Sequence, residues 1–276
     1  MVDERRYPTP IHHRNGHKGR EGKANMGILD GKTAIVTGGG QGVGRGIALA
    51  LAREGAAVVL AGRTRATLEA VRQEIEAADG RAAVGVCDIT RADEVDALIA
   101  HAITSFGGIN ILVNNAALVP HGTILGISED LVNAAWQAGP VATMRLMRQC
   151  HPHLCGGGVI INVSSGIAIS ATAPNRSAYA MVKSALNALS RAAAMEWAPD
   201  GIRVNTIMPF ALTDAVERFL QNEPEHANTV VASVPLRRIG DPELDIGRAV
   251  VFLAGPDSGY LTGATLPLDG GSAHLR

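Results

Sequence analysis

Short aliphatic runs alternate with longer amphipathic stretches along the chain from residue 32 onward. The runs are continuously apolar, which is typical of strands that are buried on both faces of a parallel sheet. A sheet of this kind needs helices on both sides, and the intervening stretches are long enough to supply them. The runs predict strands at 33–37, 57–61, 82–86, 110–113, 158–163, 202–207 and 264–267.

The stretches between the runs have helical periodicity. In the segment 65–79, Leu68, Val71 and Ile75 follow one another at intervals of three and four residues and form one apolar face. Because strands and helices alternate, we expect right-handed crossovers and an α/β fold, a doubly wound, seven-stranded parallel sheet flanked by helices. The predicted helices are 43–54, 65–79, 91–106, 128–150, 178–198 and 241–254.

Residues 1–26 differ in composition from the rest of the chain. They are rich in Arg, Lys, His, Gly and Pro and have almost no aliphatic periodicity, which predicts a flexible N-terminal tail. Residues 27–276 are expected to form a single domain. A histidine cluster in the tail could bind a metal, but a solvated basic arm explains it more simply, and we expect no metal site. The cluster consists of His12, His13 and His17.

Composition and charge exclude several classes of function. The formal net charge of −1 gives no reason to expect nucleic acid or an anionic membrane as a partner. No apolar run approaches the roughly 18 residues of a membrane span, and the N-terminus lacks the apolar core of a secretory signal. The three cysteines, Cys87, Cys150 and Cys155, form no disulfide framework. We therefore expect a cytoplasmic location.

A glycine-rich turn follows the first predicted strand, in Thr37-Gly38-Gly39-Gly40-Gln41-Gly42-Val43-Gly44, and a predicted helix begins directly after it. Glycines allow a tight turn and a close approach of the backbone to a pyrophosphate, and the N–H groups at the helix N-terminus bind that anion. A plain strand-to-helix connection is the simpler alternative. The position at the first strand of the sheet favours a dinucleotide site.

The end of the second predicted strand indicates which nicotinamide cofactor binds. A carboxylate at this position would accept hydrogen bonds from the ribose 2′-hydroxyl of NAD, but Gly62 occupies it, and Arg63 follows. A guanidinium pairs with a 2′-phosphate. NADP(H) is therefore favoured over NAD(H). The alternative is that Arg63 is only a solvated loop residue, and Arg65 could equally bind the 2′-phosphate.

Tyr179 and Lys183 are candidate catalytic residues. They are four positions apart in a predicted helix and therefore share one face. A phenol is a poor proton shuttle at neutral pH unless a nearby ammonium lowers its pKa. Lys183 is the only lysine after residue 32 in a chain that otherwise uses arginine, so its position indicates a need for an ammonium group. Ser164 and Ser165 end the fifth predicted strand, at the edge where ligands bind, either as turn residues or as orienters of a substrate carbonyl.

These residues belong to a series of motifs that resembles the short-chain dehydrogenase/reductase (SDR) family in its classical form, across residues 27–272. The motifs are TGGGQGVG at 37–44, NNAA at 114–117, NVSS at 162–165, YAMVK at 179–183, RVNTIMP at 203–209 and LTGATLPLDGG at 261–271. The resemblance implies a Rossmann-type fold and hydride transfer between the nicotinamide and a carbonyl or alcohol carbon. It also implies a homotetramer or homodimer, with contacts through the helices near 128–150 and 178–198.

The resemblance also implies roles for individual residues. Tyr179 would be the general acid/base, Ser165 would orient the carbonyl, and Lys183 would hold the nicotinamide ribose and lower the Tyr179 pKa. Asp88 would lie near the adenine, and Asn114 would line the cofactor cleft and steady the sheet. The implied cofactor contacts are Gly38, Gln41, Gly42, Val43, Gly44, Arg63, Asp88, Ile89, Asn114, Tyr179, Lys183, Pro209 and Thr213.

The chain departs from the family pattern in three places. Gly139 occupies the position of an asparagine that places a water behind the lysine, and the adjacent Pro140 predicts a kinked or broken helix. Phe210 occupies the position of the usual glycine after Pro209, and Thr213, which would contact the carboxamide, comes one residue early. The spacing from Ser165 to Tyr179 is one residue longer than is common, which predicts a bulge at 174–176.

Two further segments carry candidate features. Cys150-His151-Pro152-His153-Leu154-Cys155 has the side chains of a zinc site, although Pro152 as a helix terminator explains the segment more simply. The segment 211–240 is expected to be the least regular, and the resemblance implies that it forms a lid that excludes water and sets the substrate. Its apolar residues indicate a fairly apolar pocket: Phe210, Leu212, Val216, Phe219 and Leu220.

The sequence therefore predicts an NAD(P)-dependent oxidoreductase that acts on a ketone or secondary alcohol, with NADP(H) as the favoured cofactor. One alternative is a cofactor-binding homologue with weak or no turnover that acts as a sensor or assembly partner. The departures at Gly139 and Phe210 motivate that alternative, whereas the presence of Tyr179, Lys183 and Ser165 argues against it. A second alternative is dehydration or epimerisation through a transient ketone.

Overall fold

The computed structural model describes residues 27–170, 174–222 and 224–272. The predicted tail at 1–26, with its histidine cluster, lies outside the described residues. A seven-stranded parallel sheet runs through the domain in the order β3-β2-β1-β4-β5-β6-β7, as the alternation of runs and stretches predicted. The strands are β1 (Thr33–Thr37), β2 (Ala57–Gly62), β3 (Arg81–Val86), β4 (Ile111–Asn114), β5 (Val159–Val163), β6 (Arg203–Pro209) and β7 (Thr265–Leu268).

The strand order reverses next to β1, which pairs with β2 on one side and with β4 on the other. Successive connections therefore leave the centre of the sheet in opposite directions. The point between the carboxyl ends of β1 and β4 is where open α/β sheets form a ligand-binding crevice. The central strands are buried along their whole length, in agreement with their continuously aliphatic sequence. The Rossmann-type fold class predicted from the sequence is confirmed.

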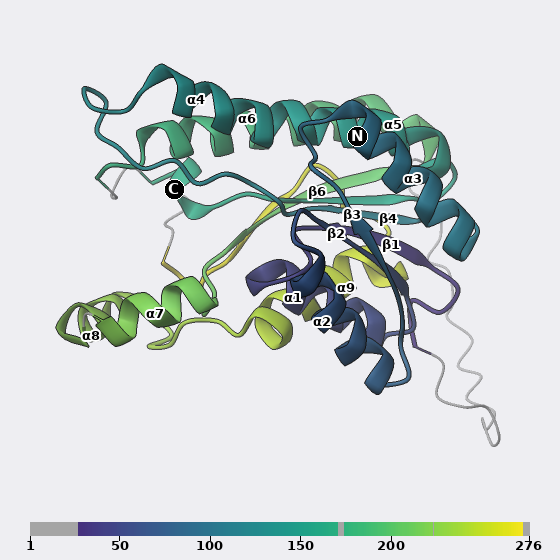
Figure 1. Cartoon of the computed structure of the whole chain (residues 1–276), viewed down its shortest axis with the longest axis horizontal. Helices are drawn as coiled ribbons and strands as arrows, with labels where there is room; N and C mark the ends of the chain where they lie inside the picture. Colours follow the sequence, from purple (N-terminus) through teal and green to yellow (C-terminus); the bar gives the residue numbers. More distant parts are fainter. Residues whose placement is uncertain (1–26, 171–173, 223, 273–276) are drawn as a thin grey trace, which may run out of the picture.

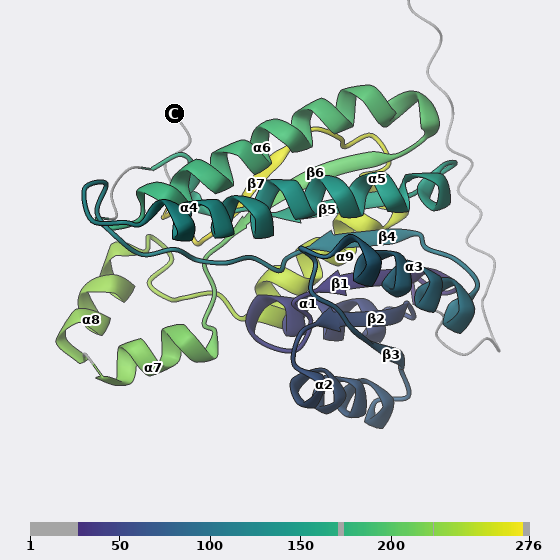
Figure 2. The same cartoon turned by 45° about the horizontal axis from the view of Figure 1, so that its top comes forward.

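Helices cover both faces of the sheet (Figure 1). On one face, α1, α2 and α9 cover an aliphatic core that includes Ile47, Leu60 and Leu68. On the other, α3, α5 and α6 cover a second core that includes Ile35, Leu112 and Leu146, and α4 continues the line of α5 (Figure 2). The helices are α1 (Gly42–Arg53), α2 (Arg65–Ala77), α3 (Ala92–Phe106), α4 (Glu129–Trp136), α5 (Ala142–Leu154), α6 (Ser177–Trp197), α7 (Asp214–Asn222), α8 (Pro224–Ser233) and α9 (Arg248–Ala254).

The predicted helix at 128–150 is broken, as the Gly-Pro pair indicated. A π-helical turn at Gln137–Val141 separates α4 from α5, and Gly139 leaves the helical region with φ −99° and ψ −109°. Pro140 lacks an N–H group and so cannot restore the regular ladder of hydrogen bonds. The expectation that Pro152 terminates the helix was wrong, because α5 continues through it to Leu154.

The segment 211–240 is more regular than its sequence suggested. It contains α7 and α8, which contact each other and project beyond the carboxyl edge of the sheet (Figure 1). Val216 and Leu220, four residues apart and both half-buried, lie on one face of α7. The expectation of an irregular segment failed because α7 and α8 are only 9 and 10 residues long, which is too short for helical periodicity to be distinguished reliably.

Candidate active site

The glycine turn lies between β1 and α1 at the crevice. Gly38 and Gly42 have φ angles of +66° and +52°, in the left-handed region that favours glycine. A Cβ on Gly44 would lie 2.2 Å from the carbonyl oxygen of Gly38, so a side chain there would disrupt the turn. Gln41 occupies the N-cap position of α1, and Val43 packs against the aliphatic core. The turn therefore leaves the N-terminus of α1 accessible to an anion, and its geometry fits a pyrophosphate.

Asn115 fixes the turn in place, a role that the sequence reasoning missed. Its Nδ2 donates to the carbonyl oxygen of Thr37 at 2.9 Å and to that of Gly38 at 3.3 Å. The Thr37 hydroxyl accepts from the backbone N–H groups of Asn115 and Ala116 in return. The loop after β4 is thus fastened to the loop after β1. The second asparagine of NNAA was the available signal for this contact.

Asn114 lies one residue earlier and is buried between strands. Its Nδ2 donates to Oδ1 of Asn162 at 2.8 Å, and Nδ2 of Asn162 donates to the hydroxyl of Ser190 at 2.8 Å. This chain of hydrogen bonds joins β4, β5 and α6. The Oδ1 atom of Asn114 has no hydrogen-bond partner within the part of the chain that the structure describes, although it is buried. Such an atom fits a cleft whose remaining partner is a ligand.

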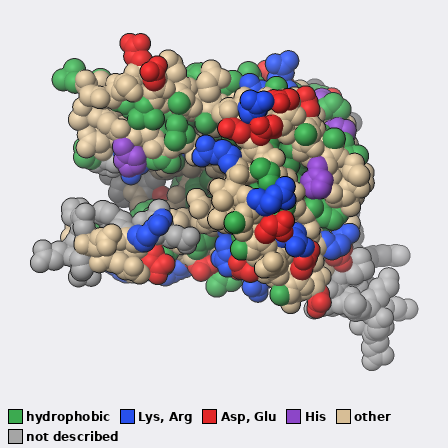
Figure 3. All heavy atoms as spheres, in the orientation of Figure 1, with side chains coloured by type: hydrophobic (Ala, Val, Ile, Leu, Met, Phe, Trp, Pro, Cys, Tyr) green, Lys and Arg blue, Asp and Glu red, His purple; other side chains and the backbone are tan. Residues whose placement is uncertain are grey.

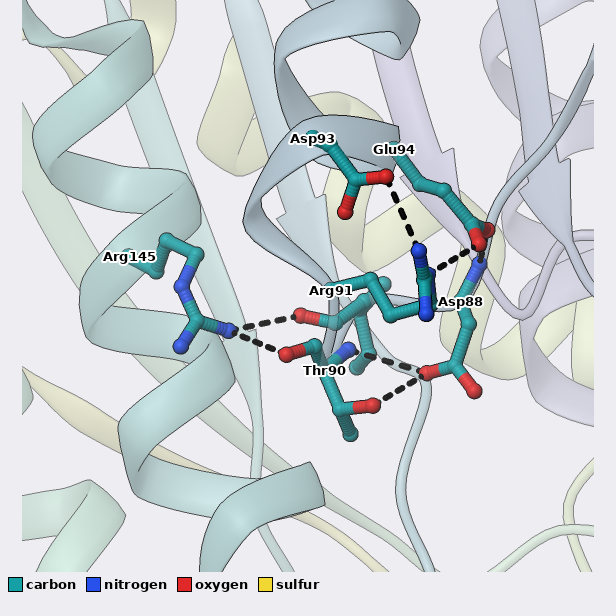
Figure 4. Close-up of polar contacts among 7 residues, drawn as sticks. Asp88, Thr90, Arg91, Asp93, Glu94 and Arg145 are labelled. Carbon is teal, nitrogen blue, oxygen red and sulfur yellow. Dashed lines mark hydrogen bonds and ion pairs between the residues drawn. The ribbon is translucent and has the colours of Figure 1, made fainter.

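The loop after β3 holds Asp88 in a fixed orientation (Figure 4). Its Oδ1 accepts hydrogen bonds from the backbone N–H and the hydroxyl of Thr90, at 2.9 and 2.7 Å. These bonds, together with the charges of Arg63 and Arg91, hold the pKa of the Asp88 carboxyl below its ordinary value. Ile89 is buried next to it, and its carbonyl oxygen accepts a hydrogen bond from Arg145 on α5.

Gly62 and Arg63 lie at the end of β2, where the sequence placed the ribose-recognition position. Gly62 is the last residue of the strand and Arg63 is exposed. Arg63 is close enough to Asp88 to lower the pKa of that carboxyl. Arg65, the second candidate, pairs with Glu69 on the same helix at 3.7 Å, so its charge is partly engaged.

The opposite wall of the crevice comes from the segment after β6. Pro209 is the last residue of β6, and Phe210 donates its backbone N–H to the carbonyl oxygen of Leu268. Thr213 directly precedes α7 and lies next to the glycine turn, since a Cβ on Gly42 would be 3.1 Å from its Cγ2. Thr213 and the turn therefore line the same crevice, despite the shortened spacing.

Tyr179, Lys183 and Ser165 are brought together beside this crevice. Tyr179 and Lys183 occupy successive turns of α6, and the Lys183 Nζ lies 5.7 Å from the centre of the Tyr179 ring. Ser165, just beyond β5, forms a side-chain hydrogen bond with Tyr179. Lys183 is buried and donates to the carbonyl oxygen of Val163 at 2.6 Å. The neighbouring Ser164 has a different partner from Ser165, because its hydroxyl donates to the carbonyl oxygen of Lys183 at 3.4 Å.

Burial dominates the acid–base properties of this pair. It raises the pKa of the Tyr179 phenol, whereas the hydrogen bond with Ser165 and the charge of Arg176 lower it. It also lowers the pKa of Lys183 to about 8. The sequence led us to expect a Tyr179 pKa below its ordinary value. The net direction in the protein is upward, because removing a phenolate from water costs more than these two interactions return.

Arg176 is a second residue that the sequence reasoning did not single out. It precedes α6 by one residue, is half-buried, and lies close enough to Tyr179 for its charge to stabilise the phenolate. The bulge expected at 174–176 is a turn in which Asn175 has a φ of +60° and accepts a hydrogen bond from the N–H of Gly122. The spacing of three residues from Tyr179 on a helix was the available signal.

The space behind Lys183 differs from that implied by the family pattern. A Cβ placed on Gly139 would lie 2.5 Å from Cγ1 of Val182, the residue that precedes Lys183. The Val182 side chain therefore packs against the bare backbone of Gly139, where an asparagine would extend. Gly139 and Val182 on α6 therefore pack closely against each other.

Comparisons with known proteins decide the family. A family model described as "Enoyl-(Acyl carrier protein) reductase" matches residues 38–273. A 12alpha-hydroxysteroid dehydrogenase from Clostridium sp. is 40% identical over 255 residues, which cover 89% of this chain and 98% of that protein. The chain belongs to the short-chain dehydrogenase/reductase family.

Other members of the short-chain dehydrogenase/reductase family are similar over the same length. A 2,5-dichloro-2,5-cyclohexadiene-1,4-diol dehydrogenase from Sphingobium indicum is 35% identical and covers 88% of this chain and 96% of its own. The crystal structure of a dehydrogenase/reductase from Sinorhizobium meliloti 1021 superimposes with a TM-score of 0.84 at 34% identity, and the match covers 90% of this chain and 98% of that one. This short-chain dehydrogenase/reductase is accordingly an oxidoreductase that acts on CH–OH or C=O groups with a nicotinamide cofactor.

The remaining expectations concern metals and membranes. Within residues 27–170, 174–222 and 224–272, no group of three or more His, Cys, Asp or Glu side chains is arranged to hold a metal ion, and this includes the segment from Cys150 to Cys155. No helix in those same ranges has the length and apolarity of a membrane span.

Proposed function

We propose that this short-chain dehydrogenase/reductase transfers hydride between NADP(H) and a ketone or secondary alcohol. The observation that carries the proposal is the joint placement of Tyr179, Lys183 and Ser165 beside a crevice that begins at the glycine turn. A phenol, an ammonium and a hydroxyl in this arrangement can bind a carbonyl oxygen and move one proton to or from it.

In the proposed mechanism the protein handles the proton, and the nicotinamide, when bound, supplies or accepts the hydride. The Tyr179 phenol donates its proton to the carbonyl oxygen during reduction and accepts the hydroxyl proton during oxidation. Ser165 holds that oxygen against Tyr179. The buried Lys183 ammonium, anchored on the carbonyl oxygen of Val163, supplies a positive charge next to the ring and would hold the nicotinamide ribose. Arg176 adds a second positive charge that favours the phenolate.

We assign the implied cofactor contacts to positions around the crevice. The backbone of Gly38, Gln41, Gly42, Val43 and Gly44 would hold the pyrophosphate at the N-terminus of α1. Asp88 and Ile89 would lie beside the adenine, and Asn114 would offer its unpartnered Oδ1 from the floor of the crevice. Pro209 and Thr213 would contact the nicotinamide end. The unpartnered Oδ1 of Asn114 and the glycine turn support this assignment.

The preference for NADP(H) rests on the end of β2. Gly62 presents no carboxylate to the ribose 2′-hydroxyl, and a 2′-phosphate there would meet no repulsion from that position. Arg63 is exposed and adjacent, so its guanidinium can pair with the phosphate. The ion pair between Arg65 and Glu69 makes Arg63 the better candidate of the two.

The substrate class is supported by the relatives and by the segment that covers the site. Two relatives are named for a hydroxysteroid and for a cyclohexadiene diol, both alcohols on rings. In this chain α7 and α8 project over the carboxyl edge, and Figure 3 shows a hollow between them and the layer that carries α4 and α6. Half-buried Phe210, Val216 and Leu220 make that side fairly apolar. We therefore favour an apolar cyclic ketone or secondary alcohol.

We further propose that the protein assembles as a homotetramer or homodimer through α4, α5 and α6. Trp136, Met144 and Met181 are exposed on these helices, and a hollow of about 480 Å³ next to Met181 is lined partly by isoleucine and valine. Exposed apolar residues grouped on neighbouring helices favour a protein contact. A cytoplasmic location remains our proposal, which the three free cysteines support.

The test is a titration with NADPH and with NADH, followed by a screen of cyclic ketones and secondary alcohols. We expect tighter binding of NADPH, and a reversed preference in the Gly62→Asp variant, because the new carboxylate repels the 2′-phosphate. Binding without turnover on the whole panel would support a sensor or assembly partner instead. Product formation without net change in NADPH absorbance would indicate dehydration or epimerisation. Equal affinity for both cofactors would contradict the role of Gly62 and Arg63.

A further inference from the structure

A group of three polar side chains lies at the amino edge of the sheet, at the opposite end of β5 from Ser165. His151 is in the last turn of α5, Cys155 follows that helix directly, and Asp200 belongs to the short turn after α6. None of the three takes part in the proposed hydride transfer. They come from two segments 45 or more residues apart in the sequence, which the fold fastens together through the backbone hydrogen bond from Gly156 N–H to the carbonyl oxygen of Asp200 at 2.8 Å.

The imidazole of His151 is oriented from three sides. Its Nε2 lies 2.9 Å from Oδ2 of Asp200, and its ring packs edge-on against the ring of Trp197 with centroids 4.9 Å apart. Its Nδ1 faces the sulfur of Cys155 at 3.9 Å. A carboxylate only accepts hydrogen bonds, so Nε2 carries the proton in the neutral ring and Nδ1 presents its lone pair to the thiol.

The thiol has a second acceptor in the same place. Cys155 Sγ also lies 3.4 Å from the carbonyl oxygen of His151, one turn earlier on the helix. The thiol proton can therefore point to the carbonyl oxygen or to Nδ1 by rotation about one bond. The arrangement of thiol, imidazole and carboxylate is that of an activated nucleophile, in which a base is within reach and a third group holds the base.

The other cysteines provide a comparison within the same chain. Burial raises the pKa of the Cys87 thiol to about 11 and that of the Cys150 thiol to about 12, so both remain protonated at neutral pH. Neither is accessible to solvent, whereas Cys155 is exposed. A reagent in solution therefore meets Cys155 first.

We propose that Cys155 is a site of thiol–disulfide exchange with low-molecular-weight disulfides, assisted by His151 and Asp200. His151 Nδ1 accepts the proton of Cys155 Sγ, and Asp200 stabilises the imidazolium through Nε2. The sulfur attacks one sulfur of the disulfide, so a new S–S bond forms as the old one breaks. The released thiolate takes the proton back from His151. One sulfur of the disulfide is reduced and leaves as a thiol, the other stays bound to Cys155, and the Cys155 sulfur is oxidised to the level of the mixed disulfide, so one S–S bond replaces another and no further oxidant is needed.

The reaction at Cys155 is independent of the oxidoreductase site. The loop that follows it leads into β5 from the amino edge, and Ser165 lies beyond the other end of that strand. We therefore expect the adduct to leave NADPH binding and turnover unchanged. A failure of the proposed hydride transfer would leave this proposal untouched, and the reverse also holds.

The experiment measures the rate of adduct formation with glutathione disulfide on the full-length protein at neutral pH, by intact mass and peptide mapping. We expect one adduct, on Cys155, and none on Cys87 or Cys150. His151→Gln and Asp200→Asn should slow the reaction at least several-fold. His153→Gln is the matched control, because this histidine is exposed on the same turn, two residues from His151, and should leave the rate unchanged.

The direction of the rate change in His151→Gln shows whether His151 acts as a base or only covers the thiol. If His151 only covered the thiol, His151→Gln would expose Cys155 and speed up the reaction. An unchanged or higher rate in His151→Gln, or an equal loss in His153→Gln, would overturn the proposal. Unfolding curves of each variant show whether the fold is intact, and Asp200→Asn, which keeps the size of the side chain, provides an independent variant if His151→Gln fails to fold.

Discussion

Two pairs of side chains, each four residues apart in the sequence, lie at opposite edges of the same sheet. Tyr179 and Lys183 on α6 are at the carboxyl edge, where Lys183 is only 4% exposed. His151 and Cys155, at the end of α5, are at the amino edge, and Cys155 is exposed. The sequence spacing is the same in both pairs. The surroundings differ, because Lys183 is enclosed between the sheet and its covering helices, whereas Cys155 is open to solvent.

The comparison shows that burial, more than spacing, sets the chemistry of such a pair. At the enclosed edge, removal from water raises the pKa of Tyr179 and lowers that of Lys183, so both groups move toward their neutral forms. At the open edge, hydrogen bonds to Asp200 and Cys155 orient the imidazole of His151. Substitutions at the first edge should therefore have large effects, and those at the second edge small ones.

The largest expected effect is that of Tyr179→Phe, which removes the proton donor and leaves the ring in place. We expect kcat to fall by about 10²–10⁴-fold, the usual contribution of general acid–base catalysis. NADPH affinity, measured by fluorescence titration, should be nearly unchanged. A residual kcat within about tenfold of the parent would show that the proton comes from another group.

The second prediction concerns the cost of burying Lys183. Its pKa is lowered to about 8 in the folded protein, below the ordinary 10.5, so below pH 8 the protein holds an ammonium that burial disfavours. Between pH 8 and 10.5 the unfolded chain binds the extra proton, and stability rises with pH across this window. Lys183→Met should remove the cost and stabilise the protein by about 1–3 kcal/mol at pH 7, less the lost hydrogen bond to Val163.

Urea unfolding of parent and Lys183→Met at several pH values checks this prediction. The stability difference should be greatest below pH 8 and should shrink as the pH approaches 10.5. Turnover should be lost in the same variant. A variant that is less stable than the parent at pH 7 would mean that the ammonium contributes net stability to the enclosed edge, and the contrast between the edges would weaken.

The third prediction concerns packing beside the buried pair. Gly139→Asn adds a Cβ that would lie 2.5 Å from Cγ1 of Val182, and we expect a loss of about 1–3 kcal/mol, as is usual for overpacking. Val182→Ala removes the opposing methyl groups. The double variant should lose less stability than the sum of the losses in the two single variants, because the clash is relieved. Strict additivity in urea unfolding would contradict the close packing of these residues.

The fourth prediction tests the charge near Tyr179. Arg176 lowers the pKa of the phenol, so Arg176→Gln should raise it further. Alcohol oxidation needs the phenolate, so the rising limb of kcat against pH should move to higher pH in the variant. Arg191→Gln, an exposed arginine on the same helix, is the control and should leave the profile in place. A shift to lower pH would mean that Arg176 acts on another group.

The smallest expected effect lies at the open edge. The contact between His151 and Asp200 is partly exposed, with side chains 27% and 44% accessible, and exposed pairs contribute about 0–1 kcal/mol. His151→Gln should therefore change the free energy of unfolding by less than about 1 kcal/mol, apart from its effect on Cys155 reactivity. A larger loss in urea unfolding would show that the contacts of His151 contribute more stability than an exposed pair does.

The strands and most helices could be predicted because their signals are local. The buried runs at 33–37 and 57–61 need only be apolar and continuous, and both form strands there. The break at Gly139 was equally visible, since it depends on the backbone properties of two residues. In contrast, α7 and α8 were missed because each is short, and the end of α5 was placed too early because Pro152 near a C-terminus does not stop a helix that has packing partners.

The sequence by itself determined the fold class, the glycine turn and the pairing of Tyr179 with Lys183, because each depends on periodicity or on residue types at fixed spacing. Only the tertiary structure decided how these groups behave. It placed Arg176 beside the phenol, packed Val182 against Gly139, fastened the glycine turn with Asn115, and brought Asp200 to His151. Each of these contacts joins segments or environments that no local pattern encodes, and a pKa depends on the burial that the complete fold creates.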